Sequence, residues 1–308
     1  MTPFRRHPFP SLPERPPRPH PFLDVPVETL SIDSAWCGPI RVAVRRFGEG
    51  PPLMLVHGLM TSGYSWRYVL EPLGQRFTLL IPDLPGNGDS EPVLTAPYTP
   101  EGLATLLGEV QAALGARGCP VVGNSMGGMI AMRWALDDPE AMSALVNIHS
   151  PGPPTARLYA LSAALAVPGA QALAAWLARR DPERWVWRNV HYFDESNKSR
   201  EETRLYGAPL STPEGSRAFV AYLRDTMSIG GLSRLVESLK ARRDGHQRFP
   251  VPLKLVYATA DPMVPPSVGD ALAALVPEAE LVWLADTSHF MHVDTPEPAV
   301  AEILGFLQ

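Results

Sequence analysis

The sequence predicts an α/β protein in which a mostly parallel, eight-stranded sheet is flanked by helices and interrupted by one helical insertion. Short apolar runs alternate with longer segments of helical periodicity, which is typical of a parallel sheet wrapped by helices. The alternation stops near Ser150 and resumes near Pro250. A loop of that length without secondary structure is rare in a compact domain, so we expect helices there.

Eight segments have the length and composition of strands. The first two are expected to pair in an antiparallel manner, and the other six are short apolar runs of the kind buried in parallel sheets. In chain order they are Val25–Ile32, Ile40–Phe47, Leu53–Val56, Leu79–Ile81, Pro120–Val122, Leu145–Ile148, Leu253–Tyr257 and Leu281–Leu284. The clearest helix begins at Thr99-Pro100, a capping residue followed by a first-turn proline, and runs to Leu114.

This pattern predicts three parts of the chain. Residues 1–24 form a proline-rich N-terminal arm, residues 25–149 together with 249–308 form an α/β core, and residues 150–248 form a helical cap. Proline removes backbone donors, so we expect the arm to be extended or partly disordered. The alternative for the arm is a proline-rich docking ligand.

The composition is that of a folded soluble protein. The 308 residues are 45% hydrophobic and 19% charged, with a net charge of −5, and the scattered signs argue against a nucleic-acid-binding face. Cys37 and Cys119 are too few and too far apart for a disulfide framework or a zinc site. The arm lacks the apolar core of a signal peptide, so we expect a cytoplasmic protein. No zinc-protease, Walker or dinucleotide-binding motif is present, so no cofactor or metal is expected.

One segment, Leu158–Ala178, lacks charged residues and is long enough to span a bilayer. Pro168-Gly169 interrupts it in the middle, and alanine supplies much of its apolar character. We therefore expect a buried helical hairpin here and no integral membrane span.

The candidate nucleophile is Ser125, in the G-x-S-x-G motif Gly123-Asn124-Ser125-Met126-Gly127. An apolar strand leads into the motif and a helical pattern follows, which is the strand–turn–helix context that the motif requires. The tight turn holds the serine in a strained backbone conformation, and the flanking glycines relieve the crowding. The start of the helix directs free N–H groups toward the serine.

Asp261 and His289 are the candidate acid and base. Asp261 follows the strand Leu253–Tyr257 and His289 follows the last strand, so the chain order is nucleophile, acid, histidine. All three residues follow carboxyl ends of strands, where ligands bind in open α/β sheets. Imidazole can remove the serine proton near neutral pH, and a carboxylate holds the imidazole in the required tautomer.

Neighbouring residues offer alternatives to these assignments. His292 is a rival base, but it lies farther from the strand end. Asp286 is expected to serve a turn, and Asp294 is expected to cap the helix that Pro296-Glu297 opens. His57 is expected to be a hydrogen-bonded structural histidine that shapes its turn.

The backbone N–H groups of Leu59 and Met126 are the expected oxyanion-hole donors. Gly58 follows the strand Leu53–Val56 and permits the sharp turn that points the next N–H toward the active site. Met126 directly follows the nucleophile, as the second donor should.

These motifs resemble those of the α/β-hydrolase superfamily, from Val25 to the C-terminus. The segment His57–Arg67 (HGLMTSGYSWR), the segment Asp83–Ser90 (DLPGNGDS) and the His289-Phe290 region look like the haloalkane dehalogenase and epoxide hydrolase branch.

The same resemblance has departures. Enzymes of that branch use an aspartate at the elbow, where this chain has Ser125. Dehalogenases carry a halide-binding tryptophan after the nucleophile and often an asparagine after His-Gly, where Met126 and Leu59 stand here. Some relatives place the acid after the sixth strand, but this chain has the non-ionisable Asn147 there.

Ser125 implies acyl transfer. A carboxylate that attacks an alkyl carbon forms an ester, which water opens, whereas a serine would form a stable ether. We therefore expect a serine hydrolase that cleaves carboxylic esters of hydrophobic small molecules. The alternatives are a carbon–carbon bond hydrolase, a perhydrolase or haloperoxidase with the same triad, and a slow-turnover ligand receptor. The apolar and aromatic residues of the cap suggest a hydrophobic acyl or alcohol pocket. The alternative, which we favour for any single tryptophan, is packing in the cap's own core. The aromatic residues are Trp176, Trp185, Trp187, Tyr192 and Phe193.

Overall fold

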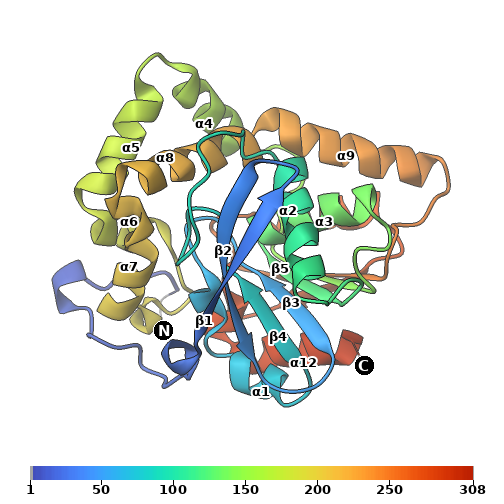
Figure 1. Ribbon diagram of the computed structural model, residues 1–308, viewed down its shortest axis with the longest axis horizontal. Coiled ribbons are helices and arrows are strands. Elements are labelled where there is room, and N and C mark those ends of the chain that lie inside the picture. The colour runs from blue at the N-terminus through green and yellow to red at the C-terminus, as the bar shows by residue number, and fades with distance from the viewer. Residues whose placement is uncertain (1–2, 308) are drawn as a thin grey trace.

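An eight-stranded sheet runs through the centre of the computed structural model, which describes residues 3–307 (Figure 1). The strand order is β1-β2-β4-β3-β5-β6-β7-β8. β2 is antiparallel to both β1 and β4, and the remaining neighbours are parallel. The strands are β1 (Val27–Ser34), β2 (Gly38–Phe47), β3 (Pro52–Val56), β4 (Thr78–Pro82), β5 (Val121–Asn124), β6 (Leu145–Ile148), β7 (Leu253–Ala258) and β8 (Glu280–Leu284). The expected fold class and all eight strands are confirmed, with shifts at their ends.

The two faces of the sheet carry separate hydrophobic layers because successive strand residues point to opposite sides. On β3, Leu53 and Leu55 belong to one layer, and Met54 and Val56 belong to the other. All four are fully buried, which explains why this strand has an uninterrupted apolar sequence rather than an alternating one.

Helices cover both layers of the sheet. α2 begins as predicted, since the Thr99 side chain accepts a hydrogen bond of 3.1 Å from the Gly102 N–H. It packs with α3, α9 and α10 in one hydrophobic layer, while α1 and α12 contribute to the other. The bounds are α1 (Leu70–Gly74), α2 (Pro100–Ala113), α3 (Met126–Asp137), α9 (Ile229–Asp244), α10 (Pro266–Leu275), α11 (Met291–Asp294) and α12 (Pro296–Leu307).

The chain between β6 and β7 is helical, as expected. Before α9 it forms α4 (Ala156–Ala166), α5 (Ala170–Arg180), α6 (Pro182–Asn189), α7 (Arg200–Gly207) and α8 (Pro213–Ala221). We call α4 to α8 the insertion. It lies to one side of the sheet, with the α4–α5 turn at its outer edge (Figure 1).

The α4–α5 hairpin differs from the prediction in its burial. The chain does turn at Pro168-Gly169, but the only residues buried between Ala156 and Arg180 are Leu165, Ala175 and Ala178. The expectation of a buried hairpin is therefore wrong. No single helix within residues 3–307 is long and apolar enough to cross a membrane, although α4 and α5 meet those criteria as a pair bent by 104°.

The described part of the N-terminal arm, residues 3–24, is extended and packs against the insertion (Figure 1). The backbone N–H of Arg200 donates to Pro13 O at 2.8 Å, and the indole N–H of Trp187 donates to His7 O at 2.9 Å. Two short 3₁₀ turns, Phe9–Ser11 and Phe22–Asp24, interrupt the extended chain. Because the proline-rich arm lacks many donors of its own, these contacts with the insertion fix its path.

Candidate active site

Ser125 occupies the sharp turn between β5 and α3. Its backbone has φ 53° and ψ −119°, a strained conformation for a residue with a side chain. The Ser125 N–H donates to Ile148 O at 2.7 Å, which ties the turn to β6. A Cβ on Gly123 would lie 2.6 Å from Gly128 Cα, and one on Gly127 would lie 2.4 Å from Val56 O. The glycines of the motif are therefore required by close backbone packing.

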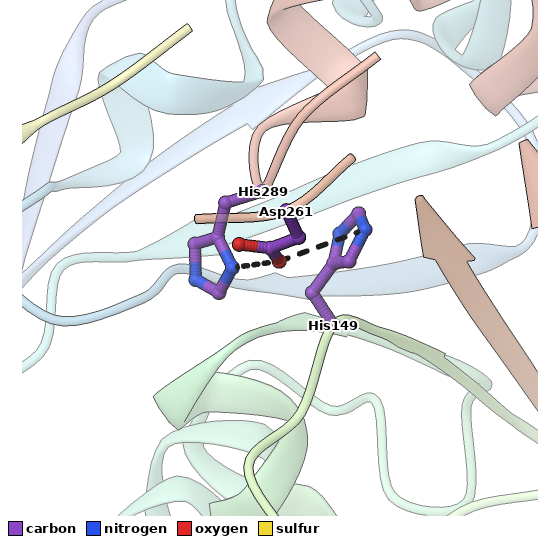
Figure 2. A group of neighbouring side chains, drawn as sticks. All are labelled: His149, Asp261 and His289. Carbon is purple, nitrogen blue, oxygen red and sulfur yellow. Dashed lines mark hydrogen bonds and ion pairs between the residues drawn. The ribbon is translucent and has the colours of Figure 1, made fainter. Parts of the chain in front are cut away.

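His289 and Asp261 meet beyond the carboxyl ends of β8 and β7. His289 Nδ1 lies 2.7 Å from Asp261 Oδ2 (Figure 2). The other carboxylate oxygen accepts hydrogen bonds from the backbone N–H groups of Met263, at 2.6 Å, and Val264, at 3.0 Å. Burial disfavours the charged form of Asp261, yet the adjacent His289 and these hydrogen bonds hold its pKa at about 2. Asp261 is therefore a carboxylate at neutral pH.

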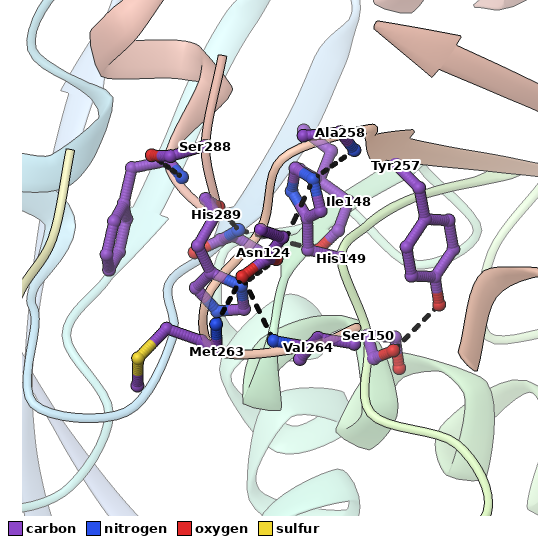
Figure 3. A network of polar contacts seen from close by, with 12 residues as sticks. Asn124, Ile148, His149, Ser150, Tyr257, Ala258, Met263, Val264, Ser288 and His289 are labelled. Atoms are coloured by element: carbon purple, nitrogen blue, oxygen red, sulfur yellow. Dashed lines mark hydrogen bonds and ion pairs between the residues drawn. The ribbon is translucent and has the colours of Figure 1, made fainter. Parts of the chain in front are cut away.

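Ser125 and His289 line the same cavity, so the structure brings the three predicted residues to one edge of the sheet. Asn124 joins the two loops, because its side-chain NH₂ donates to His289 O at 3.1 Å (Figure 3). Asn124 occupies the first variable position of the G-x-S-x-G motif, so the motif does not indicate this role.

The expected oxyanion-hole donors, the N–H groups of Leu59 and Met126, lie on the turns that follow β3 and β5. Leu59 lines the cavity, and Met126 is the first residue of α3. A Cβ on Gly58 would lie 3.2 Å from Ser125 Cβ, so the turn after β3 lies directly against the nucleophile elbow. Within residues 3–307, neither N–H donates to a protein acceptor.

The rival histidines are structural. His57 Nδ1 donates to Gly58 O at 2.8 Å, and its Nε2 accepts from the Leu84 N–H at 2.9 Å, which fixes a neutral tautomer. Burial lowers the pKa of His57 to about 4. His292 is fully buried and stacks on Trp66 with ring centroids 4.3 Å apart. Neither histidine lines the cavity.

The predicted cap role of Asp294 is wrong. Its oxygens accept hydrogen bonds from the backbone N–H groups of Ser288, Phe193 and Asp194, so it joins the loop that carries His289 to the insertion. Burial raises the pKa of Asp294 to about 6. Asp286 is an exposed turn residue with φ 54°, as expected.

His149 is a buried neighbour of Asp261 that no sequence motif marks. It follows β6, and its Nε2 accepts a 2.5 Å hydrogen bond from the Ala258 N–H and lies 3.9 Å from Asp261 Oδ2 (Figure 2). Burial lowers the pKa of His149 to about 3, so the ring is neutral. The available signal is its position directly after a buried strand, which is also the position of Ser125.

His149, Asp261 and His289 offer three metal-ligating atoms within 4.8 Å of one another. Two of these atoms already accept hydrogen bonds. His149 Nε2 accepts from the Ala258 N–H, and Asp261 Oδ2 accepts from His289 Nδ1. A metal ion there would have to displace both bonds.

The cavity has a volume of about 360 Å³ and a mostly apolar wall. The sheet side supplies Ser125 and His289, and the insertion supplies seven apolar side chains of the wall. Of the five aromatic residues that the sequence offers in the cap, Trp185 lines the cavity, whereas Trp176 is exposed and Tyr192 is buried elsewhere. The apolar wall from the insertion consists of Leu158, Leu161, Leu165, Ala174, Trp185, Val190 and Phe219, and the segment between α8 and α9 adds Leu223 and Met227.

A buried ion pair fastens α7 of the insertion to the sheet domain. Arg67 Nη2 lies 2.8 Å from Glu202 Oε2, and both side chains are almost completely buried. The Tyr192 hydroxyl donates to the same carboxylate oxygen at 2.6 Å. Burial raises the pKa of Glu202, and the adjacent Arg67 opposes that shift.

Comparison with known proteins agrees with this fold. A family model described as alpha/beta hydrolase fold matches residues 51–296, and the chain belongs to that family. An uncharacterized hydrolase of Bacillus subtilis, YugF, is 28% identical over 83% of this chain and 89% of its own length.

Two further similarities are to proteins with stated activities. A pimeloyl-(acyl-carrier protein) methyl ester esterase of Aeromonas hydrophila is 34% identical over 115 residues, which cover 36% of this chain and 42% of the esterase. The structure of the epoxide hydrolase CorEH aligns with a TM-score of 0.76 at 20% identity, over 91% of this chain and 98% of CorEH. At that identity the structural likeness shows the fold alone.

Proposed function

We propose that this hydrolase is a serine esterase that cleaves carboxylic esters of hydrophobic small molecules. The observation that carries the proposal is the arrangement of Ser125 and His289 on one cavity, with Asp261 bonded to His289 Nδ1. The bond from Nδ1 leaves His289 Nε2 as the basic nitrogen that removes the serine proton.

The reaction follows from this arrangement. Ser125 Oγ attacks the ester carbonyl while His289 takes its proton, and the resulting oxyanion accepts hydrogen bonds from the N–H groups of Leu59 and Met126. His289 then protonates the leaving alcohol, which leaves an acyl group on Ser125. A water molecule, deprotonated by His289, opens the acyl-enzyme and restores the serine. Asp261 stabilises the imidazolium in each step.

The identity of the nucleophile supports ester substrates over epoxides. An epoxide carbon attacked by Ser125 would become an ether, which water does not open, so turnover would stop. A carbonyl substrate gives an ester intermediate that hydrolyses. The partial similarity to a methyl ester esterase favours the same reaction class.

The cavity wall favours apolar acyl or alcohol groups. Trp185 and Phe219 contact each other edge to face, with ring centroids 6.1 Å apart, and both line the cavity. We propose that residues 150–248 act as a cap over this cavity, and that 25–149 and 249–308 are the catalytic core.

The test is hydrolysis of p-nitrophenyl esters from acetate to palmitate by the wild type and by Ser125→Ala. We expect turnover by the wild type and a loss of about 10⁶-fold in kcat for the variant, the scale measured when a serine hydrolase loses its nucleophile. The matched control is Ser31→Ala, an exposed serine on β1, which should keep the wild-type rate.

The outcomes separate the possible assignments. Equal rates for Ser125→Ala and the wild type would remove Ser125 as nucleophile. Wild-type inactivity on every ester, combined with cleavage of a vinylogous diketone, would replace the esterase assignment with carbon–carbon bond hydrolysis.

A further inference from the structure

The exposed apolar surface of this protein is concentrated on the α4–α5 hairpin. Eight large hydrophobic side chains are exposed within residues 3–307, and five of them lie on this hairpin or its turn. Smaller exposed residues between them are mainly alanines, and no charged residue occurs from Leu158 to Ala178. The five exposed side chains are Tyr159, Val167, Leu173, Trp176 and Leu177. Apolar patches of this kind mark interaction sites on folded proteins.

The shape of the hairpin suits a membrane surface rather than a membrane span. Each helix has 11 residues, a length of about 16 Å at 1.5 Å per residue, against about 30 Å for a bilayer core. The helices are bent by 104° at Pro168-Gly169, so they do not form one continuous rod. The turn lies at the outer edge of the insertion, far from the sheet (Figure 1).

Charged and aromatic residues at the base of the hairpin match a phospholipid interface. Arg157 precedes the uncharged stretch, and Arg179 and Arg180 follow it directly. The Arg180 guanidinium lies over the Trp176 ring, 5.3 Å from its centroid. Tryptophan and arginine favour the boundary between acyl chains and headgroups, where an apolar ring and a cation are both solvated. The nearest acidic residue in sequence, Asp181, is paired with Arg184 at 3.4 Å.

We propose that the α4–α5 hairpin docks the protein on a phospholipid bilayer, with the apolar turn and α5 side chains in the interface and the three arginines at the headgroups. This binding mode is that of an amphipathic surface segment, in which buried apolar area supplies affinity and anionic lipid adds to it. The docking is independent of the catalytic reaction.

The hairpin also connects the docking surface to the cavity. Its inner side chains Leu158, Leu161, Leu165 and Ala174 form part of the cavity wall. A docked molecule therefore holds one wall of its substrate cavity against the lipid. If the proposed esterase activity holds, apolar esters dissolved in the bilayer are the substrates that reach Ser125 most directly.

The test measures binding of the full chain to lipid vesicles by flotation, without substrate. The vesicles are phosphatidylcholine alone and phosphatidylcholine mixed with phosphatidylglycerol. We expect the wild type to float with both, and more completely with the anionic mixture. The double variant Leu173→Ser/Leu177→Ser should bind the vesicles at least tenfold more weakly. Each leucine contributes binding free energy in proportion to the apolar area that it buries in the bilayer.

The control is Leu94→Ser, which changes a leucine of the same exposure, 51% against 55% for Leu173, at a site remote from the hairpin in sequence. It should bind as the wild type does. Equal urea unfolding midpoints for all variants will show that folding is unchanged, as expected for exposed positions. Arg157→Gln/Arg180→Gln should lose only the enhancement by phosphatidylglycerol.

Three results would overturn the docking. One is wild-type protein that floats with neither vesicle, and another is equal loss of binding in Leu94→Ser. The third is a concentration-dependent dimer, seen by sedimentation, that Leu173→Ser/Leu177→Ser converts to monomer, since a second copy would then cover this face. Ser125→Ala should float like the wild type, so failure of the esterase assignment and failure of docking are separate observations.

Discussion

The two sides of the cavity are built differently. On the sheet side, polar groups are buried and hydrogen-bonded: the Asp261 carboxylate has three partners, and the Ser125 N–H is tied to Ile148. On the hairpin side, α4 and α5 present apolar residues both to the cavity and to the outside. Only Leu165, Ala175 and Ala178 of these two helices are buried.

The difference separates two tasks. Proton transfer needs atoms held within a fraction of an ångström, which buried hydrogen bonds on rigid strands provide. Recognition of apolar groups needs only an apolar surface, and helices with few buried contacts are the part of a fold that opens at low free-energy cost. In the proposed function, the sheet side fixes the geometry of the reaction, and the hairpin side selects the apolar groups that reach it.

After Ser125→Ala, the largest effect on the sheet side is expected from Asp261→Asn. The asparagine carbonyl can still accept the N–H groups of Met263 and Val264, so its NH₂ group faces His289 Nδ1. The imidazole must then accept at Nδ1 and carry its proton on Nε2, where it cannot take the proton of Ser125. We expect kcat for p-nitrophenyl butyrate to fall by about 10⁴.

Asp286→Asn is the matched control for this variant. Asp286 is exposed in a turn with positive φ, a conformation that asparagine tolerates well, and the carboxylate bonded to His289 is that of Asp261 instead. Its rate should equal that of the wild type. A near-normal rate for Asp261→Asn would mean that another group orients His289.

Parts of the insertion differ in how they are held: a buried ion pair joins α7 to the sheet domain, whereas α4 and α5 have few buried residues. Arg67→Met, which removes the cation of that pair, tests this difference. The change leaves the Glu202 carboxylate buried in α7 without its cation, which typically costs about 3–5 kcal/mol of unfolding free energy. Urea unfolding will measure the loss. Arg67→Met/Glu202→Leu should recover much of it, since neither charge of this pair then remains buried.

Arg234→Met serves as the surface comparison for Arg67→Met. Arg234 pairs with Glu101 at 3.2 Å in an exposed position, where an ion pair is worth less than about 1 kcal/mol. Equal losses in Arg67→Met and Arg234→Met would show that the α7 contact is no stronger than a surface pair, and that the whole insertion resembles the hairpin.

The sequence predicts the sheet side well because its constraints are local. The turn of five residues leaves no space for a Cβ at Gly123 or Gly127. The two glycines therefore mark the turn in the sequence, and the serine between them is identified with it. Asp261 and His289 are identified by their positions just after apolar strands, and parallel pairing carries those positions to one edge.

Other features depend on contacts between distant segments. Asp294 has the sequence position of a helix cap, but the backbone of Phe193 and Asp194, about a hundred residues away in the chain, competes for its carboxylate. The hairpin has the composition of a buried helix pair, and its exposure depends on how the insertion packs. His149 directly follows a strand, as Ser125 does. Its proximity to Asp261 arises only in the folded chain, so the local sequence does not indicate it.

Apart from the Arg234→Met comparison, the smallest expected effect is the pH dependence of stability that Asp261 adds. Its pKa is about 2 in the folded protein, against about 3.9 in an unfolded chain, so folding favours the ionised form. This contribution is complete above about pH 4 and is lost as the pH falls toward 2. A difference of about two pKa units corresponds to about 2–3 kcal/mol. The free-energy difference between the wild type and Asp261→Asn should shrink by that amount over this range, measured by urea unfolding.

Asp294 provides a contrast of opposite sign in a different pH window. Burial raises its pKa to about 6, so the folded protein binds a proton there more tightly than the unfolded chain does. Its contribution to stability therefore increases as the pH falls from about 6 to 4, and Asp294→Asn should lose that increase. A wild type and an Asp261→Asn variant that lose stability in parallel from pH 5 to 2 would contradict the assigned carboxylate–imidazole pair. If these two stability curves are parallel while Asp294→Asn still loses its increase in stability between pH 6 and 4, only the assigned contact between Asp261 and His289 is wrong.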